Sequence, residues 1–272
     1  MKKRFFYRKD NDPVELKFAK AIGAKKLDRK DFEKNPENYK DAVLILRGLR
    51  SRRILQIAGK NEIDYYYMDT GYFGNYGKGK IWHRIIKNNL HMDSITDRSK
   101  DRFDYIIRTS KRNLLYPKAG LVKPWNKKGS KILLCPPTQK SFTYYGKDYD
   151  VWMKNTVGEI KKYTDREIVI REKPESRTAR VIYNTIWRAL DEDIWAVVTY
   201  NSIVAVEAVT HGIPAFCLGP NAASFVSRTD LSKIEDPLYP KRQMWLNNLA
   251  YSQFSTVEME SGAAWKILGE KR

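Results

Sequence analysis

One segment of the chain, residues 195–219 (WAVVTYNSIVAVEAVTHGIPAFCLG), combines residue types that suit a phosphate-bearing ligand. The apolar run that ends at Thr199 predicts a buried strand, and Asn201 and Ser202 fall where the next helix would begin. Free backbone N–H groups and the Ser202 hydroxyl would face any anion at this helix start. Glu207, one and a half turns along, could accept hydrogen bonds from a ribose diol. The competing interpretation is an ordinary helix cap followed by a surface carboxylate.

A second segment, residues 64–80 (DYYYMDTGYFGNYGKGK), places a carboxylate at the end of an aromatic strand. Asp69 is suited there to act as a general base that deprotonates an attacking hydroxyl group. The glycines that follow allow backbone to approach a ligand closely. The alternative is that Asp69 only fixes the turn by a hydrogen bond to the backbone. Interleaved aromatic side chains and lysines also suit stacking on exposed bases, although tyrosines in a strand commonly belong to the core.

The net charge of +19 is distributed unevenly along the chain. Residues 1–130 hold 32 Lys and Arg against 15 Asp and Glu, a net of +17, whereas residues 131–272 hold 19 against 17, a net of +2. An excess confined to one half suggests that this half meets a polyanion, with nucleic acid ahead of an anionic membrane surface or an acidic glycan. A solvated basic surface is the alternative.

Three basic clusters in the first half each follow an expected strand, and we take them as candidate nucleic-acid contacts. If the strands end at the same edge of a sheet, the clusters would form one positively charged surface. Otherwise they are scattered charges that keep the protein soluble. The clusters are Arg47, Arg50, Arg52 and Arg53; Lys78 and Lys80; and Arg108, Lys111 and Arg112.

Short β-rich runs alternate with helix-like stretches along the whole chain, which is typical of α/β proteins with parallel strands. In the first half we expect strands at 4–7, 42–46, 65–68 and 105–108, and helices at 14–22, 51–60 and 80–89. Residues 116–130, rich in Pro, Gly and Lys, form a good linker. In the second half we expect strands at 131–135, 167–171, 196–199 and 214–218, and helices at 150–163, 177–190, 203–211, 241–251 and 256–268.

Two alternations separated by a linker predict two Rossmann-like domains that face a central cleft. The expected domains are 1–125, which binds the acceptor, and 126–272, which binds the donor, with the final helix free to pack back on the first domain. In open α/β sheets ligands bind beyond the carboxyl ends of the strands, so the residues at those ends are the candidates for ligand binding.

The string NSIVAVEAVTHGIPAF resembles the donor-site motif of GT-B glycosyltransferases, especially those related to capsular polysaccharide biosynthesis proteins, and EIVIREKP at 167–174 resembles the same group. The resemblance covers about residues 130–220 and implies a GT-B fold. It also implies that Arg171 and Lys173 contact the donor diphosphate, that Ser202 caps it, and that Glu207 holds the ribose. Fixed cations and helix N–H groups would then stabilise the leaving group without a divalent metal.

A neutral donor half joined to a basic acceptor half resembles the viral enzymes that glycosylate hydroxymethylated DNA bases. The main hypothesis is therefore transfer from a UDP-sugar, with UDP-glucose as the first choice, to a hydroxymethylated base extruded from double-stranded DNA. Asp69 would deprotonate the base hydroxymethyl group, and one in-line displacement would invert the anomeric carbon. Two alternatives stay open: a capsule or lipopolysaccharide glycan as acceptor, and a non-catalytic nucleic-acid-binding protein of the same fold.

The remaining expectations concern metals, cysteines and location. No apolar run approaches the length of a membrane span and no signal peptide is evident, so we expect a monomeric cytoplasmic protein (host cytoplasm if viral) without membrane insertion. Cys135 and Cys217 lie in apolar runs typical of buried thiols. The three histidines are scattered, so we expect neither a metal site nor a tightly bound cofactor. The acidic run at 191–193 suits a solvated loop.

Overall fold

The computed structural model describes residues 3–8, 11–75, 81–110, 122–173 and 186–269, which form two compact units. Unit 1 comprises residues 1–72, 80–106 and 247–272, and unit 2 comprises residues 73–79 and 107–246. The chain passes from unit 2 back into unit 1 within helix α10, residues Gln243–Tyr251.

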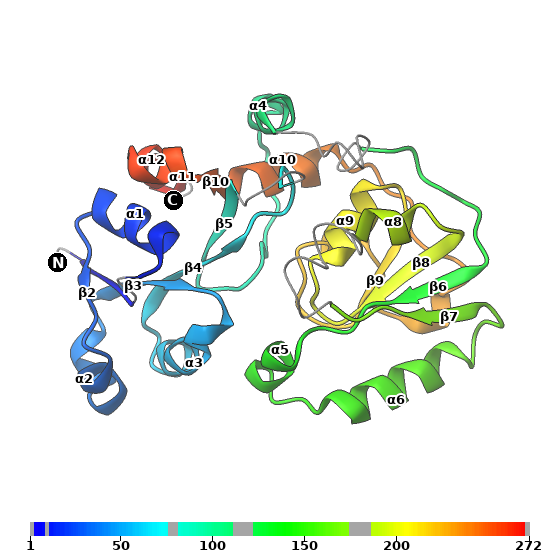
Figure 1. Cartoon of the computed structure of the whole chain (residues 1–272), viewed down its shortest axis with the longest axis horizontal. Coiled ribbons are helices and arrows are strands. Elements are labelled where there is room, and N and C mark those ends of the chain that lie inside the picture. Colours follow the sequence, from blue (N-terminus) through cyan, green and yellow to red (C-terminus); the bar gives the residue numbers. More distant parts are fainter. Residues whose placement is uncertain (1–2, 9–10, 76–80, 111–121, 174–185, 270–272) are drawn as a thin grey trace. The chain divides into compact units, whose positions relative to one another are not determined.

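Unit 1 contains a six-stranded sheet in the order β10-β5-β4-β3-β1-β2 (Figure 1). Strands β2, β1, β3 and β4 are parallel to one another, whereas β5 is antiparallel to both β4 and β10. The sheet is therefore mixed. Its strands are β1 (Arg4–Tyr7), β2 (Lys25–Lys26), β3 (Ala42–Arg47), β4 (Asp64–Thr70), β5 (Trp82–Lys87) and β10 (Gln253–Ser255).

Helices cover both faces of this sheet (Figure 1). On one face Phe18 of α1, Met259 of α11 and Leu268 of α12 join strand residues such as Ile45 in the core. On the other face α3 buries an apolar stripe that includes Ile54, as expected for an amphipathic helix. The helices of unit 1 are α1 (Pro13–Ala21), α2 (Arg29–Lys34), α3 (Arg52–Lys60), α4 (Asp101–Thr109), α11 (Thr256–Glu260) and α12 (Ala263–Gly269), with short 3₁₀ turns at Pro36–Tyr39 and Leu49–Ser51.

Unit 2 contains a four-stranded sheet in the order β7-β6-β8-β9, and every neighbouring pair is parallel. Side chains such as Leu134, Val198 and Phe216 pack with Ile160 of α6 into the core. The strands are β6 (Lys131–Leu134), β7 (Glu167–Ile170), β8 (Ile194–Thr199) and β9 (Ala215–Cys217). The helices are α5 (Gln139–Tyr144), α6 (Tyr149–Ile160), α8 (Ile186–Leu190) and α9 (Val204–Thr210), with 3₁₀ turns at Ser224–Val226 and Leu231–Lys233.

Local signals fix several helix ends. Asp12 accepts hydrogen bonds from two backbone N–H groups at the start of α1, with Pro13 in the first turn, which is a typical N-cap. Gly212, with φ of +88°, follows the end of α9, in agreement with the helix expected over 203–211. Gly262, with φ of +80°, separates α11 from α12, so the single helix expected over 256–268 is two helices.

Two element predictions are wrong. Residues 80–89 were expected to be helical, but residues 82–87 form strand β5. Residues 105–108 were expected to be a strand, but they lie within helix α4. Residues 82–87 form a strand because of tertiary pairing: β5 lies between β4 and β10, and β10 comes from the far end of the chain. The residues of β5 from Trp82 to Ile86 are all buried.

The segment from Asn247 onward belongs to unit 1. The sequence grouped residues 126–272 in one domain and left only the final helix free to pack back on the first domain. Strand β10 pairs with β5, and the buried guanidinium of Arg102 on α4 holds the same segment. Arg102 Nη1 lies 2.7 Å from Glu258 Oε1, and its other nitrogens donate to the carbonyls of Ala250 and Gln253. The return of the chain thus depends on long-range contacts.

Candidate functional site

All four strands of the sheet in unit 2 end at one edge because they are parallel. From β6 the chain proceeds to β7 on one side and later to β8 on the other. Such a reversal of strand order leaves a crevice beyond the carboxyl ends, which is where open α/β sheets bind ligands. The loops after β6, β7 and β8 meet at this edge, and they carry every residue that we predicted for donor binding except Glu207, which lies on α9.

The loop between β8 and α9 is held by hydrogen bonds to other segments of unit 2. Thr199 Oγ1 donates to the Cys135 carbonyl at 2.5 Å, and this joins the ends of β8 and β6. Asn201 is buried, and its Oδ1 accepts from Ser141 Oγ at 2.9 Å. The Ser202 carbonyl accepts from Asn221 Nδ2 at 2.9 Å. The loop is therefore fixed on both sides before any ligand binds.

Ser202 lies two residues before α9, as the sequence indicated. Its Oγ is 3.4 Å from the Val204 nitrogen, a long contact at the start of the helix. A contact of that length satisfies the hydroxyl weakly, and the side chain is partly exposed. The hydroxyl can therefore turn toward a ligand phosphate at little cost.

Arg171 and Glu207 lie near the same buried sulfur, that of Cys135 at the end of β6. Burial raises the pKa of the Cys135 thiol to about 12; the positive charge of Arg171 lowers that pKa, and the negative charge of Glu207 raises it. The Arg171 backbone N–H donates to the Leu134 carbonyl at 2.9 Å, which fixes where its side chain begins. A cation from the β7 loop and a carboxylate from α9 thus both act on one sulfur at the end of β6. Lys173, two residues beyond Arg171, is exposed.

Asp69 is the penultimate residue of β4 and is partly exposed. Its Oδ1 accepts from the Thr70 N–H at 2.7 Å, and its Oδ2 accepts from the Tyr67 hydroxyl at 2.9 Å. Oδ2 also lies 3.4 Å from Nη2 of Arg84, the residue opposite it on β5. Asp69 belongs to the strand ladder, and its carboxylate is held by the Thr70 N–H, the Tyr67 hydroxyl and the Arg84 guanidinium.

Arg84 is a site residue that the sequence analysis missed. Its guanidinium is buried, donates to the carbonyls of Thr70 and Leu90, and lies 5.6 Å from the ring centroids of both Tyr67 and Tyr72. The nearby charge of Asp69 raises the pKa of Arg84 even though burial opposes this. The helix expected over residues 80–89 hid this pairing. Arg84 could have been found only by predicting residues 82–87 as a strand that pairs with the strand carrying Asp69.

The basic clusters are only partly available to a polyanion. Arg47 Nη1 lies 2.7 Å from both oxygens of Asp12, so this side chain serves the start of α1. Glu33 on α2 pairs with Arg53 at 3.2 Å and with Arg29 at 2.6 Å. Arg50 is exposed, Arg52 is partly exposed, and Arg108 is exposed at the end of a helix rather than of a strand. Lys78, Lys80, Lys111 and Arg112 lie outside the described residues.

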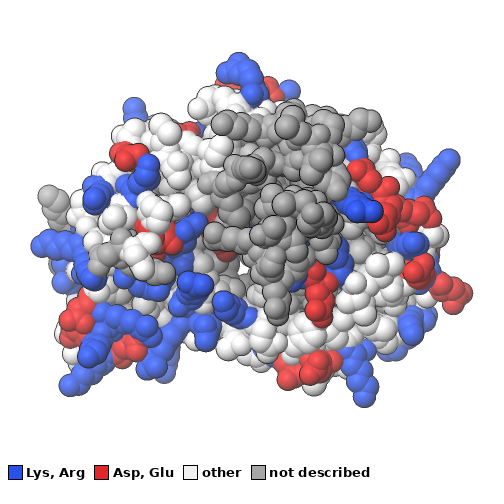
Figure 2. Space-filling view, in the orientation of Figure 1, with Lys and Arg blue, Asp and Glu red and all other residues white. Residues whose placement is uncertain are grey.

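Exposed cations nevertheless gather on unit 1. In the face drawn in Figure 2, Lys and Arg concentrate over the elements that Figure 1 labels β2, α2 and α3, whereas over unit 2 both signs of charge are mixed. The exposed basic residues of those elements are Lys25, Lys26, Arg29, Lys30, Lys34, Arg53 and Lys60. This is a local patch, because the net charges of the two units are similar: unit 1 holds 27 Lys and Arg against 18 Asp and Glu, a net of +9, and unit 2 holds 24 against 14, a net of +10.

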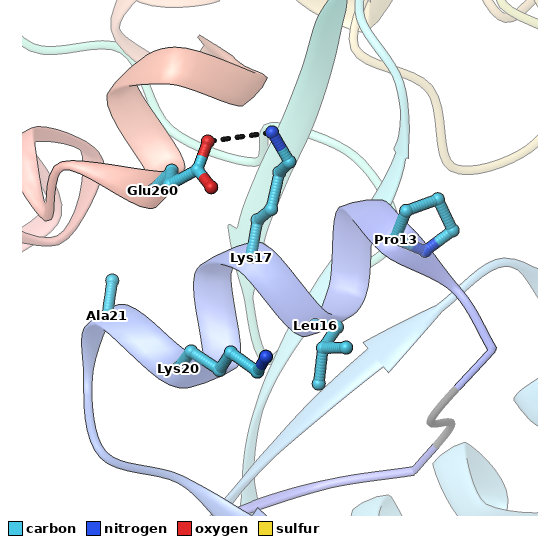
Figure 3. Close-up of a pocket in the computed structure, with 6 residues that line it drawn as sticks. All are labelled: Pro13, Leu16, Lys17, Lys20, Ala21 and Glu260. Atoms are coloured by element: carbon cyan, nitrogen blue, oxygen red, sulfur yellow. Dashed lines mark hydrogen bonds and ion pairs between the residues drawn. The ribbon is translucent and has the colours of Figure 1, made fainter.

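A surface pocket in unit 1 lies between α1 and α11 and is lined by residues that include Leu16, Lys20 and Glu260 (Figure 3). Lys17 Nζ pairs with Glu260 across it at 2.7 Å. None of the predicted site residues lines this pocket, so we do not assign the reaction to it.

The described part of the chain contains no group of three or more His, Cys, Asp or Glu that could hold a metal ion, and no helix in it is long and apolar enough to span a membrane. Both cysteines are free and buried, as expected. The acidic run at 191–193 lies in an exposed turn, although Asp191 also pairs with Lys123 at 2.8 Å.

No known family model matches the sequence, and no curated protein sequence matches it. Two solved structures share the fold, both from Thermosulfurimonas dismutans KpsC. A beta Kdo 2,7 transferase aligns at a TM-score of 0.50 with 14% identity, over 99% of this chain and 100% of that chain. A beta Kdo 2,4 transferase aligns at a TM-score of 0.52 with 15% identity, over 93% and 92%. The fold is α/β of the GT-B type. The central cleft expected between two domains stays a prediction.

Proposed function

We propose that the protein is a glycosyltransferase that binds a nucleotide-sugar donor at the carboxyl edge of the sheet in unit 2. One observation carries the proposal: Arg171, Ser202 and Glu207 lie around the strand ends of β6, β7 and β8 in a fold shared with two glycosyltransferases over almost the whole chain. These are the positions at which the sequence motif resembles a GT-B donor site. Fold alone does not fix a function, so the site residues are essential to the argument.

Each donor-site residue has a distinct role in the proposal. Arg171 and Lys173 neutralise the donor phosphates, and the Ser202 hydroxyl donates to one of them. Glu207 accepts hydrogen bonds from the ribose diol, and Asn201 holds the loop in place. As the bond between sugar and phosphate breaks, charge grows on the leaving nucleotide, and fixed cations stabilise it without reorganising. The proposal requires neither a divalent metal nor a tightly bound cofactor.

The first donor to test is UDP-glucose, the choice that the sequence favoured. Nucleotide-activated Kdo is the second, because both structural neighbours are Kdo transferases. For the acceptor we propose a hydroxyl group of a glycan, as in capsule polymers. DNA with hydroxymethylated bases is the competing acceptor, and the surface charge of unit 1 is its support.

In the proposed reaction Asp69 takes the proton of the acceptor hydroxyl, whose oxygen then attacks the anomeric carbon of the donor. The bond from that carbon to the phosphate oxygen breaks in the same step, and the nucleotide leaves with the electron pair. A single displacement inverts the anomeric centre. Tyr67 and Arg84 hold the carboxylate of Asp69 in one orientation, which suits positioned proton transfer.

The test is a transfer assay with purified protein, a panel of nucleotide sugars and two acceptor classes. The acceptors are capsule-type oligosaccharides and duplex DNA that contains 5-hydroxymethylcytosine, and the products are weighed by mass spectrometry. We expect a sugar mass increment on an oligosaccharide. A sugar mass increment on DNA alone would show that the acceptor is DNA rather than a glycan. The absence of any transfer, together with the absence of nucleotide binding, would overturn the proposal.

A further inference from the structure

Strand β7 is the outermost strand at one edge of the sheet in unit 2. At the opposite edge the backbone of β9 is covered, because Arg228 exchanges hydrogen bonds with Ala215 and Cys217. Within the described residues, β7 pairs only with β6. An edge strand that nothing covers presents a row of backbone groups to which another strand can add.

The outward-facing backbone groups of β7 belong to Ile168 and Ile170. The Arg171 N–H donates to the Leu134 carbonyl at 2.9 Å, so the backbone of Arg171 faces β6. Successive residues of a strand face opposite sides of the ladder. Val169 therefore also faces β6, whereas the N–H and C=O groups of Ile168 and Ile170 point away from the sheet. These two residues offer donors and acceptors to one further strand.

The outer strand of unit 1 has a protection that β7 lacks. Strand β2 consists of two exposed lysines, and lysines at an edge discourage the addition of another strand. Strand β7 contains neither lysine nor proline. Exposed apolar side chains lie along its side of unit 2 instead: Ile170 is 51% exposed, Val151 at the start of α6 is 57% exposed, and Tyr163 before the amino end of β7 is 41% exposed.

The segment that contains β7, residues 165–173 (DREIVIREK), is complementary in charge to a second copy of itself. When two copies run antiparallel with Val169 opposite Val169, every acidic residue faces a basic one. The outward-facing isoleucines also face each other, so they can exchange both backbone hydrogen bonds, as in an antiparallel ladder. A shift of two residues in either direction places isoleucine and valine opposite charges. The facing pairs are Asp165 and Lys173, Arg166 and Glu172, Glu167 and Arg171, and Ile168 and Ile170.

The charged pair nearest the centre can contribute most. Arg166 is already held by Glu235. In contrast, the side chain of Glu167 is 64% exposed, and its contact with Lys131 is long, at 3.7 Å. Glu167 can therefore turn toward an arginine of another chain, and cross-strand pairs of opposite charge stabilise a sheet. Because a guanidinium has several N–H donors, Arg171 can face this carboxylate and still reach a phosphate.

We infer that the protein forms a symmetric dimer in which the β7 strands of two copies pair antiparallel about Val169. The two four-stranded sheets then form one continuous sheet. A two-fold axis makes every contact twice, so both ends of the pairing carry a Glu167–Arg171 pair. The inference goes beyond the proposed function and does not depend on it, because it rests on the edge strand. It departs from the monomer expected from the sequence.

Sedimentation-velocity ultracentrifugation of the full chain over a concentration series measures dimerisation. Glu167→Arg places two arginines opposite each other at both ends of the pairing, and Arg171→Glu places two glutamates there. When the two variants are mixed in equal amounts, a mixed dimer has opposite charges at both ends again. Glu192→Arg, in the exposed turn before β8, is the control for the change in net charge.

A second pair of variants tests the backbone pairing itself. Ile170→Pro removes an outward-facing N–H that β6 does not use, and proline is tolerated at such a position of an edge strand. Ile170→Val keeps the N–H and is the matched control. Circular dichroism of every variant reports whether it is folded.

We expect the wild type, Ile170→Val and Glu192→Arg to dimerise as the concentration rises. Each charge variant alone should dimerise about tenfold more weakly or worse, because like charges directly opposite each other destabilise a strand pair. Their mixture should dimerise like the wild type, and Ile170→Pro should stay monomeric.

Three results would overturn the inference. The first is a wild type that stays monomeric over the whole series. The second is a dimer that persists in folded Glu167→Arg or Ile170→Pro, which would place the interface elsewhere. The third is a mixture of the two charge variants that fails to dimerise, which would reject the pairing about Val169. Each leaves the proposed function intact, because nucleotide binding is measured separately.

Discussion

The two units differ in how their sheets gather polar side chains. In unit 2 every strand pair is parallel, so one edge collects the loops with Arg171 and Ser202. In unit 1 the antiparallel strand β5 lies beside β4, and Asp69 is therefore paired with buried Arg84 within the ladder. The comparison teaches that a parallel sheet builds a site from successive local motifs. A mixed sheet builds one from residues that only long-range pairing brings together.

The units also divide the proposed chemistry. Unit 2 holds the cation, hydroxyl and carboxylate that suit a nucleotide, whereas unit 1 holds one oriented carboxylate and the patch of exposed cations over β2, α2 and α3. If this division is right, substitutions in unit 1 should affect transfer but not nucleotide binding, and substitutions at the unit 2 edge should affect binding first.

The largest effect is expected for Asp69→Asn in unit 1. Loss of the general base should lower the rate of transfer about a thousandfold, while nucleotide affinity stays within about twofold. Exposed Asp97 in the same unit offers the control Asp97→Asn, which should transfer normally. Steady-state kinetics and calorimetry measure the two quantities. Normal turnover in Asp69→Asn would reject this base assignment.

The next largest effect concerns the C-terminal return of the chain into unit 1. Arg102→Ala leaves Glu258 and two backbone carbonyls without their buried partner. Breaking such a pair should lower the free energy of unfolding by about 3 kcal/mol. Urea denaturation measures it, with Lys100→Ala as the control at the exposed position directly before α4. An unchanged urea midpoint would show that the segment is held by its apolar contacts alone.

A smaller loss is expected for Arg171→Ala at the edge of unit 2. Removing a charged hydrogen-bond partner of phosphate should weaken nucleotide binding about 10- to 100-fold. Arg188 on α8 is exposed in the same unit, and Arg188→Ala should bind like the wild type. Equal affinities for both variants would remove Arg171 from the donor site.

The smallest effect concerns pH and a surface charge cluster in unit 1. Burial opposes ionisation of Asp64, but hydrogen bonds from Lys3, Asn88 and Lys87 outweigh it and lower the pKa of Asp64 to about 2. A lowered pKa stabilises the fold above the unfolded value near 4, and this stability is lost as the pH falls through 2. Because the ion pairs are partly exposed, Asp64→Asn should cost about 1 kcal/mol at pH 7.

Urea denaturation at pH 7 and at pH 2 tests this prediction. The difference between Asp64→Asn and the wild type should shrink at the lower pH, because Asp64 is then about half protonated in the folded state and almost fully protonated in the unfolded state. A difference that stays constant would assign it to packing rather than to charge.

Much of unit 2 could be predicted from the sequence. Thr199, Ser202 and Gly212 mark a strand end, a helix start and a helix end through local chemistry, and the structure confirms each. Unit 1 was harder because β10 is short and pairs with β5 across more than 160 residues of chain. Their pairing overrides the local pattern of residues 80–89. Arg84 was missed for the same reason, since its role exists only opposite Asp69.

Hydrogen–deuterium exchange with a saturating nucleotide sugar tests the central claim, a donor site at the unit 2 edge, most directly. Mass spectrometry of peptides then shows which amides become protected. We predict protection in residues 135–145, 171–173 and 200–207, with little change in β3 and β4 of unit 1. Protection confined to unit 1, or none at nucleotide concentrations that saturate binding, would contradict the account.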